Sequence, residues 1–281
     1  MKNRKLNYIL FIVFFGLGAV AYKFYDVISI ESINLEILNT PTSAGGSLNF
    51  KQLDGTKFKG DKPWLGDRVI VLYEDQVLGS FENYGKAPNE IEVRQRLKRY
   101  YGEERIILDV ESWSLRTEQR LDPMAETHAQ WYLDVLQWAH DELPGTDLGY
   151  YGLPTNPYFP LKIPAIFMAD YQQEIAYLKP VLEASDSLYP SFYIYYDEPD
   201  RLNYVWSTQL YQAKVYGKPV YPFLWHRGPG SILKNDFLPD YLIEQLCSFV
   251  RTNADGFVWW SISWEEWNGE AWYDTASECF S

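Results

Sequence analysis

The most informative segment of the chain reads Ile106-Ile107-Leu108-Asp109-Val110-Glu111-Ser112-Trp113. Three aliphatic residues followed by acid, aliphatic and acid predict a buried strand that ends at a charged rim. Side chains two positions apart share a strand face, so Asp109 and Glu111 are expected side by side, with Cα atoms roughly 6–7 Å apart. One of two such carboxyl groups keeps its proton to higher pH, as a general acid must. Two solvated acids at a strand end are the alternative.

Strand-like and helix-like segments alternate on both sides of this segment. Strands are expected at Ile33–Leu38, Val69–Tyr73, the start of Leu148–Pro154, Ser187–Tyr195, Pro219–Trp225 and Gly256–Trp260. Helices are expected at Asn89–Tyr101, Ala125–Leu143, Ile175–Ala184, Val205–Tyr216 and Tyr241–Thr252, and a loop rich in Gly and Lys between Gly46 and Lys62. Seven or eight parallel strands joined by helices close best as a barrel. We therefore expect an α/β fold, a distorted (β/α) TIM-like barrel, as a single domain over residues 26–281.

In such a barrel the chemistry lies at the C-terminal ends of the strands. Asp109 and Glu111 are at such an end. The other polar and aromatic residues expected at strand ends are Tyr151, Ser191, Tyr193, His226, Arg227 and Trp260. This convergence favours a catalytic cleft over a merely solvated strand end.

Residues 1–25 are expected to direct export. Met1-Lys2-Asn3-Arg4-Lys5 is basic, and the apolar run from Tyr8 to Tyr22 is shorter than the roughly 20 residues of a spanning helix. Ala19-Val20-Ala21 fits a cleavage site, so a cleaved signal peptide and a signal anchor both remain open. In an exported protein Cys247 and Cys279 could form a disulfide, and two free buried thiols are the alternative.

Composition limits the kinds of molecule that the protein is expected to bind. The net charge of −13 argues against nucleic acid and against an anionic membrane surface, so membrane contact is expected only through an uncleaved N-terminal segment. The 11 Trp and 23 Tyr residues favour a cleft that stacks sugars. No Gly-x-Ser-x-Gly elbow or phosphate loop occurs, and the three His are scattered, so no metal or cofactor is expected. Of the three, His226 alone is expected to reach the cleft.

Six motifs lie at the expected strand ends: Asn39-Thr40-Pro41-Thr42, Leu72-Tyr73-Glu74-Asp75 with Leu78-Gly79, Asp109-Val110-Glu111-Ser112-Trp113, Gly149-Tyr150-Tyr151-Gly152-Leu153-Pro154, Leu188-Tyr189-Pro190-Ser191-Phe192-Tyr193, and Gly256-Phe257-Val258-Trp259-Trp260 with Ser263-Trp264-Glu265. Together and in this order they resemble motifs of the hyaluronidase family of glycoside hydrolases, which are distorted (β/α) barrels. The cysteines that the family carries near Asn39–Thr42 and Thr155–Tyr158 are missing. The chain thus resembles a distant, minimal member.

The resemblance implies a mechanism that also suits two acids on one strand. A conventional retaining pair stands on opposite sides of the scissile bond, about 5–5.5 Å apart. Here Glu111 would protonate the glycosidic oxygen, while ionised Asp109 would orient the 2-acetamido group of the substrate for attack on the anomeric carbon. Tyr151, Tyr193 and Ser191 would bind the sugar and Trp260 would form an apolar wall beneath it. Arg227 would pair with a uronate carboxylate or with a carboxylate of the rim.

Three functions remain open from the sequence. The first is an exported endo-β-N-acetylhexosaminidase of hyaluronidase type, acting on a polysaccharide of the hyaluronan or chondroitin kind. The second keeps the chemistry but acts on peptidoglycan or another glycan that contains N-acetylglucosamine, which the acidic charge favours. The third is a catalytically silent barrel that binds glycans, against which the intact Asp109 and Glu111 pair argues.

Overall fold

The computed structural model describes residues 50–59, 66–117, 120–155, 165–195, 199–229, 236–261, 265–267 and 271–280. Segment 1–25, the strand expected at Ile33–Leu38 and the motif Asn39–Thr42 lie outside this part of the chain, as does the side chain of Cys279. These predictions stay predictions. Within the described part, strands alternate with helices, and the fold is α/β with mainly parallel strands.

The parallel strands form two sheets. The first has the order β2-β1-β9-β8 and contains β1 (Lys51–Asp54), β2 (Asp67–Arg68), β8 (Phe223–Trp225) and β9 (Gly256–Trp260). The second has the order β3-β4-β7 and contains β3 (Ile70–Tyr73), β4 (Arg105–Asp109) and β7 (Asp147–Tyr150). A separate antiparallel hairpin joins β5 (Arg116–Thr117) to β6 (Arg120–Leu121). Strand β4 is deeply buried, as its run of three aliphatic residues predicts.

Backbone contacts connect the two sheets on both sides. Between β2 and β3, the Val69 N–H donates to the Asp54 carbonyl of β1 at 3.1 Å. On the other side, segment 187–195 runs between β7 and β8 through parallel bridges that join Tyr151 to Tyr189, Leu188 to Val220, and Ser191 to Phe223. The sequence analysis expected a full strand there. Only isolated bridges form, and Pro190, which has no N–H, interrupts the hydrogen bonding.

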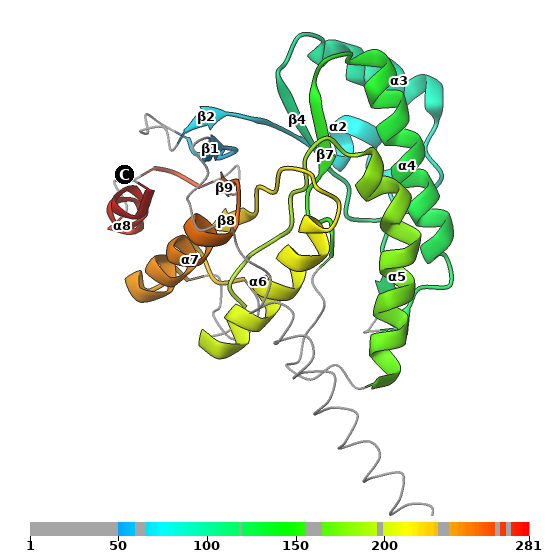
Figure 1. Cartoon of the computed structure of the whole chain (residues 1–281). Helices are drawn as coiled ribbons and strands as arrows, with labels where there is room; N and C mark the ends of the chain where they lie inside the picture. Colours follow the sequence, from blue (N-terminus) through cyan, green and yellow to red (C-terminus); the bar gives the residue numbers. More distant parts are fainter. Residues whose placement is uncertain are drawn as a thin grey trace, which may run out of the picture.

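The helices lie outside the strands (Figure 1). They are α2 (Glu74–Leu78), α3 (Glu90–Leu97), α4 (Ala125–Glu142), α5 (Ala165–Ala184), α6 (Pro199–Lys214), α7 (Asp240–Asn253) and α8 (Ala271–Phe280), with 3-10 turns η1 (Phe81–Asn83) and η2 (Lys98–Tyr100). Helices α3, α4 and α5 cover the side of β4 and β7, and α7 and α8 the side of β8 and β9. The expected helices are confirmed, although α5 and α6 begin about ten and six residues earlier than predicted.

Helix α3 forms within the expected range Asn89–Tyr101 and is stabilised by a cap and by ion pairs. The Asn89 side chain accepts a hydrogen bond from the Glu92 N–H at 3.2 Å and caps the first turn. Ion pairs join Glu90 to Arg94 at 2.8 Å and Glu92 to Arg96 at 3.2 Å, four residues apart on the exposed face. The buried side of the helix carries Val93 and Leu97.

The structure corrects the N-terminal part of the prediction. Lys51–Asp54, placed in a loop by the sequence analysis, forms β1, which pairs with both β2 and β9. Its pattern is weak because Leu53 is its one aliphatic residue, and the pairing on both edges decides the conformation instead. The approach to β9 is close: a Cβ on Gly256 would lie 2.0 Å from the Lys51 carbonyl oxygen.

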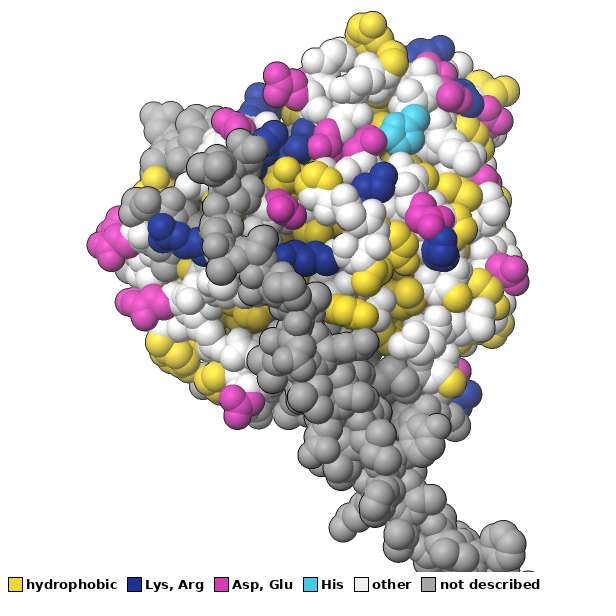
Figure 2. Space-filling model, viewed as in Figure 1, with side chains coloured by type: hydrophobic (Ala, Val, Ile, Leu, Met, Phe, Trp, Pro, Cys, Tyr) yellow, Lys and Arg dark blue, Asp and Glu magenta, His cyan; other side chains and the backbone are white. Residues whose placement is uncertain are grey.

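Charged side chains of both signs are interspersed over the face of the molecule in Figure 2. The described residues on this face form no extended basic patch. Among the helices that the structure describes, none combines the length and apolarity that a membrane span requires.

The pairing of β7 with segment 187–195 depends on Gly149. A Cβ at this position would lie 2.3 Å from the Ser187 carbonyl oxygen and 2.8 Å from the Tyr189 ring. We expect Gly149→Ala to lower the free energy of unfolding by about 1–3 kcal/mol, since backbone must move to admit the methyl group. Gly55→Ala is the matched control, because its Cβ would meet the Val258 side chain at 3.1 Å. Urea unfolding of both variants tests this, and an equal or larger loss for Gly55→Ala would contradict it.

Candidate active site

The ends of the parallel strands bring most of the predicted residues to one rim. Strand β4 ends at Asp109, and β3 places Tyr73 opposite it in the register. On the other side, the Tyr151 N–H donates to the Leu108 carbonyl at 2.9 Å, so β7 leads Tyr151 to the same level. Strand β9 ends at Trp260. Parallel strands present these ends on the same side, as in a barrel active site.

Asp109 is the last residue of β4 and only 7% exposed, whereas Glu111 lies beyond the strand end and is exposed. The sequence analysis placed both acids on the strand itself. The two side chains nevertheless share a hydrogen bond. The backbone between them is held because the Tyr132 hydroxyl donates to the Val110 carbonyl at 2.6 Å. Trp113 is fully buried, and its indole N–H donates to the Lys86 carbonyl at 3.1 Å.

Burial dominates the protonation of the two acids. It raises the pKa of Asp109 to about 8, with further increases from the negative charges of Glu111 and Glu74. Glu111 is partly open to solvent, but the atoms packed around its carboxyl group still desolvate it. This desolvation, followed by the charge of Glu74, also raises the pKa of Glu111, while the hydrogen bond from Asp109 lowers it. In the ligand-free pair the proton therefore resides mainly on Asp109. The sequence analysis assigned it to Glu111, and the deeper burial of Asp109 accounts for the difference.

Three neighbours of this pair were not predicted as site residues. The Lys57 ammonium lies 3.7 Å from the centre of the Tyr73 ring. Burial lowers the pKa of Lys57, and the negative charges of Asp109 and Asp75 offset part of this decrease. Burial raises the pKa of Tyr73 to about 12. Glu74 accepts a hydrogen bond from the Ser112 hydroxyl. The motif around Tyr73 could have indicated two of them, but Lys57 follows the strand that the sequence analysis missed.

Four predicted sugar-binding residues form a connected aromatic and hydroxyl wall. The Tyr151 and Ser191 hydroxyls are 3.5 Å apart, and Tyr193 hydrogen-bonds to Tyr151. Tyr193 stacks on Trp260 with ring centres 5.8 Å apart and an interplanar angle of 29°. The Trp260 indole N–H donates to the Tyr73 hydroxyl at 2.8 Å. Burial raises the pKa of both Tyr151 and Tyr193, so their hydroxyls stay protonated as hydrogen-bond donors.

Arg227 and His226 belong to a different cluster. The Arg227 guanidinium contacts Glu265 Oε1 at 2.6 Å and lies over the Phe237 ring at 3.7 Å. His226 is completely buried, with Nε2 at 3.0 Å from both Glu265 oxygens and its ring stacked on Trp272 of α8. The expectation that His226 reaches the cleft is therefore wrong. Of the two roles considered for Arg227, the structure shows the rim ion pair.

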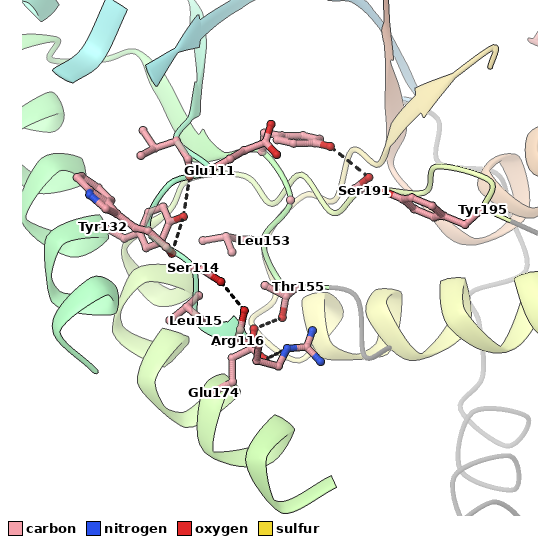
Figure 3. Close-up of a pocket in the computed structure, with 14 residues that line it drawn as sticks. Glu111, Ser114, Leu115, Arg116, Tyr132, Leu153, Thr155, Glu174, Ser191 and Tyr195 are labelled. Atoms are coloured by element: carbon pink, nitrogen blue, oxygen red, sulfur yellow. Dashed lines mark hydrogen bonds and ion pairs between the residues drawn. The ribbon is translucent and has the colours of Figure 1, made fainter. Parts of the chain in front are cut away.

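A pocket of about 290 Å³ opens beside Glu111 (Figure 3). Glu111, Tyr151 and Ser191 line one part of it. The rest of the lining comes from the segment after β4, from α4 and α5, and from the segments around Thr155 and Tyr195. The sequence does not indicate this pocket because residues from five separate segments form it.

The described residues hold no group of three or more His, Cys, Asp or Glu side chains arranged to bind a metal ion. The side chains that line the rim around Asp109 are mainly acids, hydroxyls and aromatic rings. A buried acid that can hold a proton near neutral pH, next to a second carboxyl group, can move a proton to and from a substrate.

Solved structures with a similar fold were found by comparison. Bee venom hyaluronidase has a TM-score of 0.59 and 15% sequence identity, covering 76% of this chain and 91% of that one. The same enzyme in complex with a hyaluronic acid tetramer has a TM-score of 0.55 and 18% identity, covering 69% of this chain and 78% of that one. At these identities the likeness shows a distant hyaluronidase-like fold.

Neither a protein-family profile nor a curated protein matches the sequence. The resemblance stated from the sequence motifs is therefore supported at the level of the fold.

The raised pKa of Asp109 predicts a dependence of stability on pH. The unfolded carboxyl group ionises near pH 4, whereas the folded one keeps its proton to about pH 8, so the free energy of unfolding falls as pH rises between these values. Asn mimics the protonated acid. We expect Asp109→Asn to be more stable than the wild type by about 1 kcal/mol or more near pH 8, with the gap closing near pH 4.

Urea unfolding at both pH values measures this. Glu244→Gln, an exposed carboxyl group on α7, is the control and should show no such trend. A pH-independent effect of Asp109→Asn would contradict the assignment.

Proposed function

We propose that this chain is a glycoside hydrolase that cleaves β-N-acetylhexosaminide bonds within a glycan, with retention of configuration and with the substrate's own acetamido group as nucleophile. The observation that carries the proposal is the state of Asp109. Its carboxyl group is buried and linked to Glu111, and its Oδ1 receives no hydrogen bond from a donor in the described part of the chain. An acetamide N–H of a bound sugar supplies the donor that such an oxygen requires.

The proposed first step forms a bond between the acetamido carbonyl oxygen and the anomeric carbon. The glycosidic C–O bond breaks, and its oxygen takes the proton of Glu111, which leaves Glu111 as a carboxylate. The resulting oxazolinium ion is positively charged, and ionised Asp109 stabilises it through the N–H. In the second step water attacks the anomeric carbon and gives a proton to Glu111, and the bond between that carbon and the acetamido oxygen breaks, which restores the acetamido group.

The shared proton must move before the first step. In the ligand-free site it lies mainly on Asp109. When the acetamide N–H approaches, the ionised form of Asp109 gains a hydrogen bond, which favours transfer of the proton to Glu111. One proton per pair is the active state, so the pair titrates as a unit rather than as two independent acids.

The aromatic and hydroxyl wall has a defined part in this proposal. Tyr151, Tyr193 and Ser191 bind the acetamido group and neighbouring oxygens, and Trp260 packs against the reacting sugar, because these four side chains already contact one another at the rim. Arg227 is not assigned to the substrate. Export through residues 1–25 remains part of the proposal, as does completion of the two sheets into a distorted barrel, which the bridges along segment 187–195 support.

Glu111→Gln tests the proposed acid. We expect kcat to fall by about 10²–10⁴-fold, since the leaving oxygen loses its proton donor while binding contacts remain. Release of reducing ends from a panel of N-acetylglucosamine-containing glycans measures the rate, with Glu244→Gln as the control that keeps wild-type activity. Wild-type rates in Glu111→Gln would refute the acid. Glycan binding without turnover, unchanged by Asp109→Asn, would favour a silent glycan-binding barrel instead.

A further inference from the structure

The pocket beside Glu111 has two polar ends (Figure 3). One end carries Glu111 and Ser191, which the proposed reaction uses. The other carries Arg116, Thr155 and Glu174, which it does not use. A pocket of about 290 Å³ is close to the lower limit of small-ligand sites, roughly 300 Å³, and suits one sugar unit rather than several.

The far end of the pocket holds a buried, hydrogen-bonded ion pair rather than an ion pair on the surface. Glu174 of α5 is only 1% exposed, and its Oε2 lies 2.5 Å from Arg116 Nε. Its Oε1 accepts a hydrogen bond from the Thr155 hydroxyl at 2.5 Å. The Arg116 guanidinium also lies 5.4 Å from the centre of the Tyr171 ring. The positions of both charges are therefore fixed before any ligand arrives.

The chemistry of this end matches hydroxyl groups. The Arg116 guanidinium, whose side chain is 17% exposed, offers N–H donors to the oxygen of a sugar hydroxyl, while the buried Glu174 carboxylate holds the guanidinium in place and balances its charge. The two charges compensate each other, so the pair does not require a charged ligand. Tyr195 and Tyr132 add hydroxyl-bearing rings to the same lining.

Charge around the pocket disfavours an anionic sugar. A carboxylate bound there would face the one negative charge that Glu111 shares with Asp109 at one end and the charge of Glu174 at the other. The described cations near the site are already engaged: Arg116 with Glu174, Arg227 with Glu265, and Lys57 beside Asp109 and Asp75. An anionic sugar would therefore bring its carboxylate close to these acids without gaining a cation as partner, and this repulsion weakens its binding.

We propose that this pocket is a binding subsite for an uncharged, hydroxyl-rich sugar unit next to the cleaved bond, with Arg116 and Glu174 as its specificity-determining pair. The proposal rests on the function proposed above and selects its substrate class, a neutral glycan containing N-acetylhexosamine. A glycan in which uronic acid units alternate with N-acetylhexosamine is disfavoured as a substrate.

The test uses two glycans that differ in one group. One is a hyaluronan oligosaccharide, and the other is the same oligosaccharide with each uronate carboxyl group reduced to a hydroxymethyl group. We expect kcat/KM to be at least about tenfold higher for the reduced form. Equal or faster turnover of the anionic form overturns the inference.

Binding to Glu111→Gln, measured by calorimetry, separates this inference from the proposed function. Tighter binding of the reduced form without turnover by the wild type supports the subsite and refutes the hydrolase. Turnover of other glycans with no binding preference between the two forms refutes the subsite alone. If neither form is bound or cleaved, the subsite is refuted as well.

Glu174→Gln tests the specificity pair itself. It keeps the size of the side chain but leaves the Arg116 charge available to a carboxylate, so the preference for the reduced glycan should shrink by about tenfold or reverse. Should that variant not fold, the double variant Arg116→Met with Glu174→Met removes both charges without leaving one unpaired. It should raise KM for the reduced glycan about tenfold, with Glu244→Gln as control. An unchanged preference in Glu174→Gln, or an unchanged KM in the double variant, overturns the assignment.

Discussion

The burial of Asp109 at the end of β4 is the constraint on which the site depends. Strand β4 lies between β3 and β7 and carries three fully buried aliphatic residues, so its last side chain emerges into a dry environment. That environment disfavours the charged carboxylate and keeps a proton between Asp109 and Glu111. Burial of Asp109 thus lowers the stability of the fold near neutral pH, and it also keeps a proton available for chemistry there.

The surroundings of the pair divide into two functional halves. On one side the aromatic and hydroxyl wall around Tyr193 and Trp260 is apolar apart from its donors. On the other side the pocket leads to the compensated pair of Arg116 and Glu174. In the function proposed above, the first half binds the N-acetyl sugar and the second half binds a neutral, hydroxyl-rich sugar unit. The charges of the described site thus favour a neutral glycan in the proposed function, whereas the resemblance alone leaves the glycan open.

The sequence predicted those parts of the fold that strong local patterns encode. The aliphatic run of β4 and the helices expected at Asn89–Tyr101 and Ala125–Leu143 all appear in the structure. Strand β1 was missed because its conformation depends on pairing with β2 and β9. Lys57 and the pocket were missed for a related reason: they are defined by segments distant in sequence, and no local pattern indicates such contacts. His226 was misplaced because nothing in the sequence shows that α8 folds over it.

In the proposed mechanism the substrate's acetamido group attacks the anomeric carbon. The decisive measurement is the rate for a series of substrates in which the acetyl group carries none, one, two or three fluorine atoms, because fluorine lowers the nucleophilicity of the carbonyl oxygen while leaving the glycosidic bond unchanged. We expect kcat to fall steeply along the series, by about tenfold or more per fluorine, because the weakened bond is made only in the transition state. A rate independent of fluorination would contradict it.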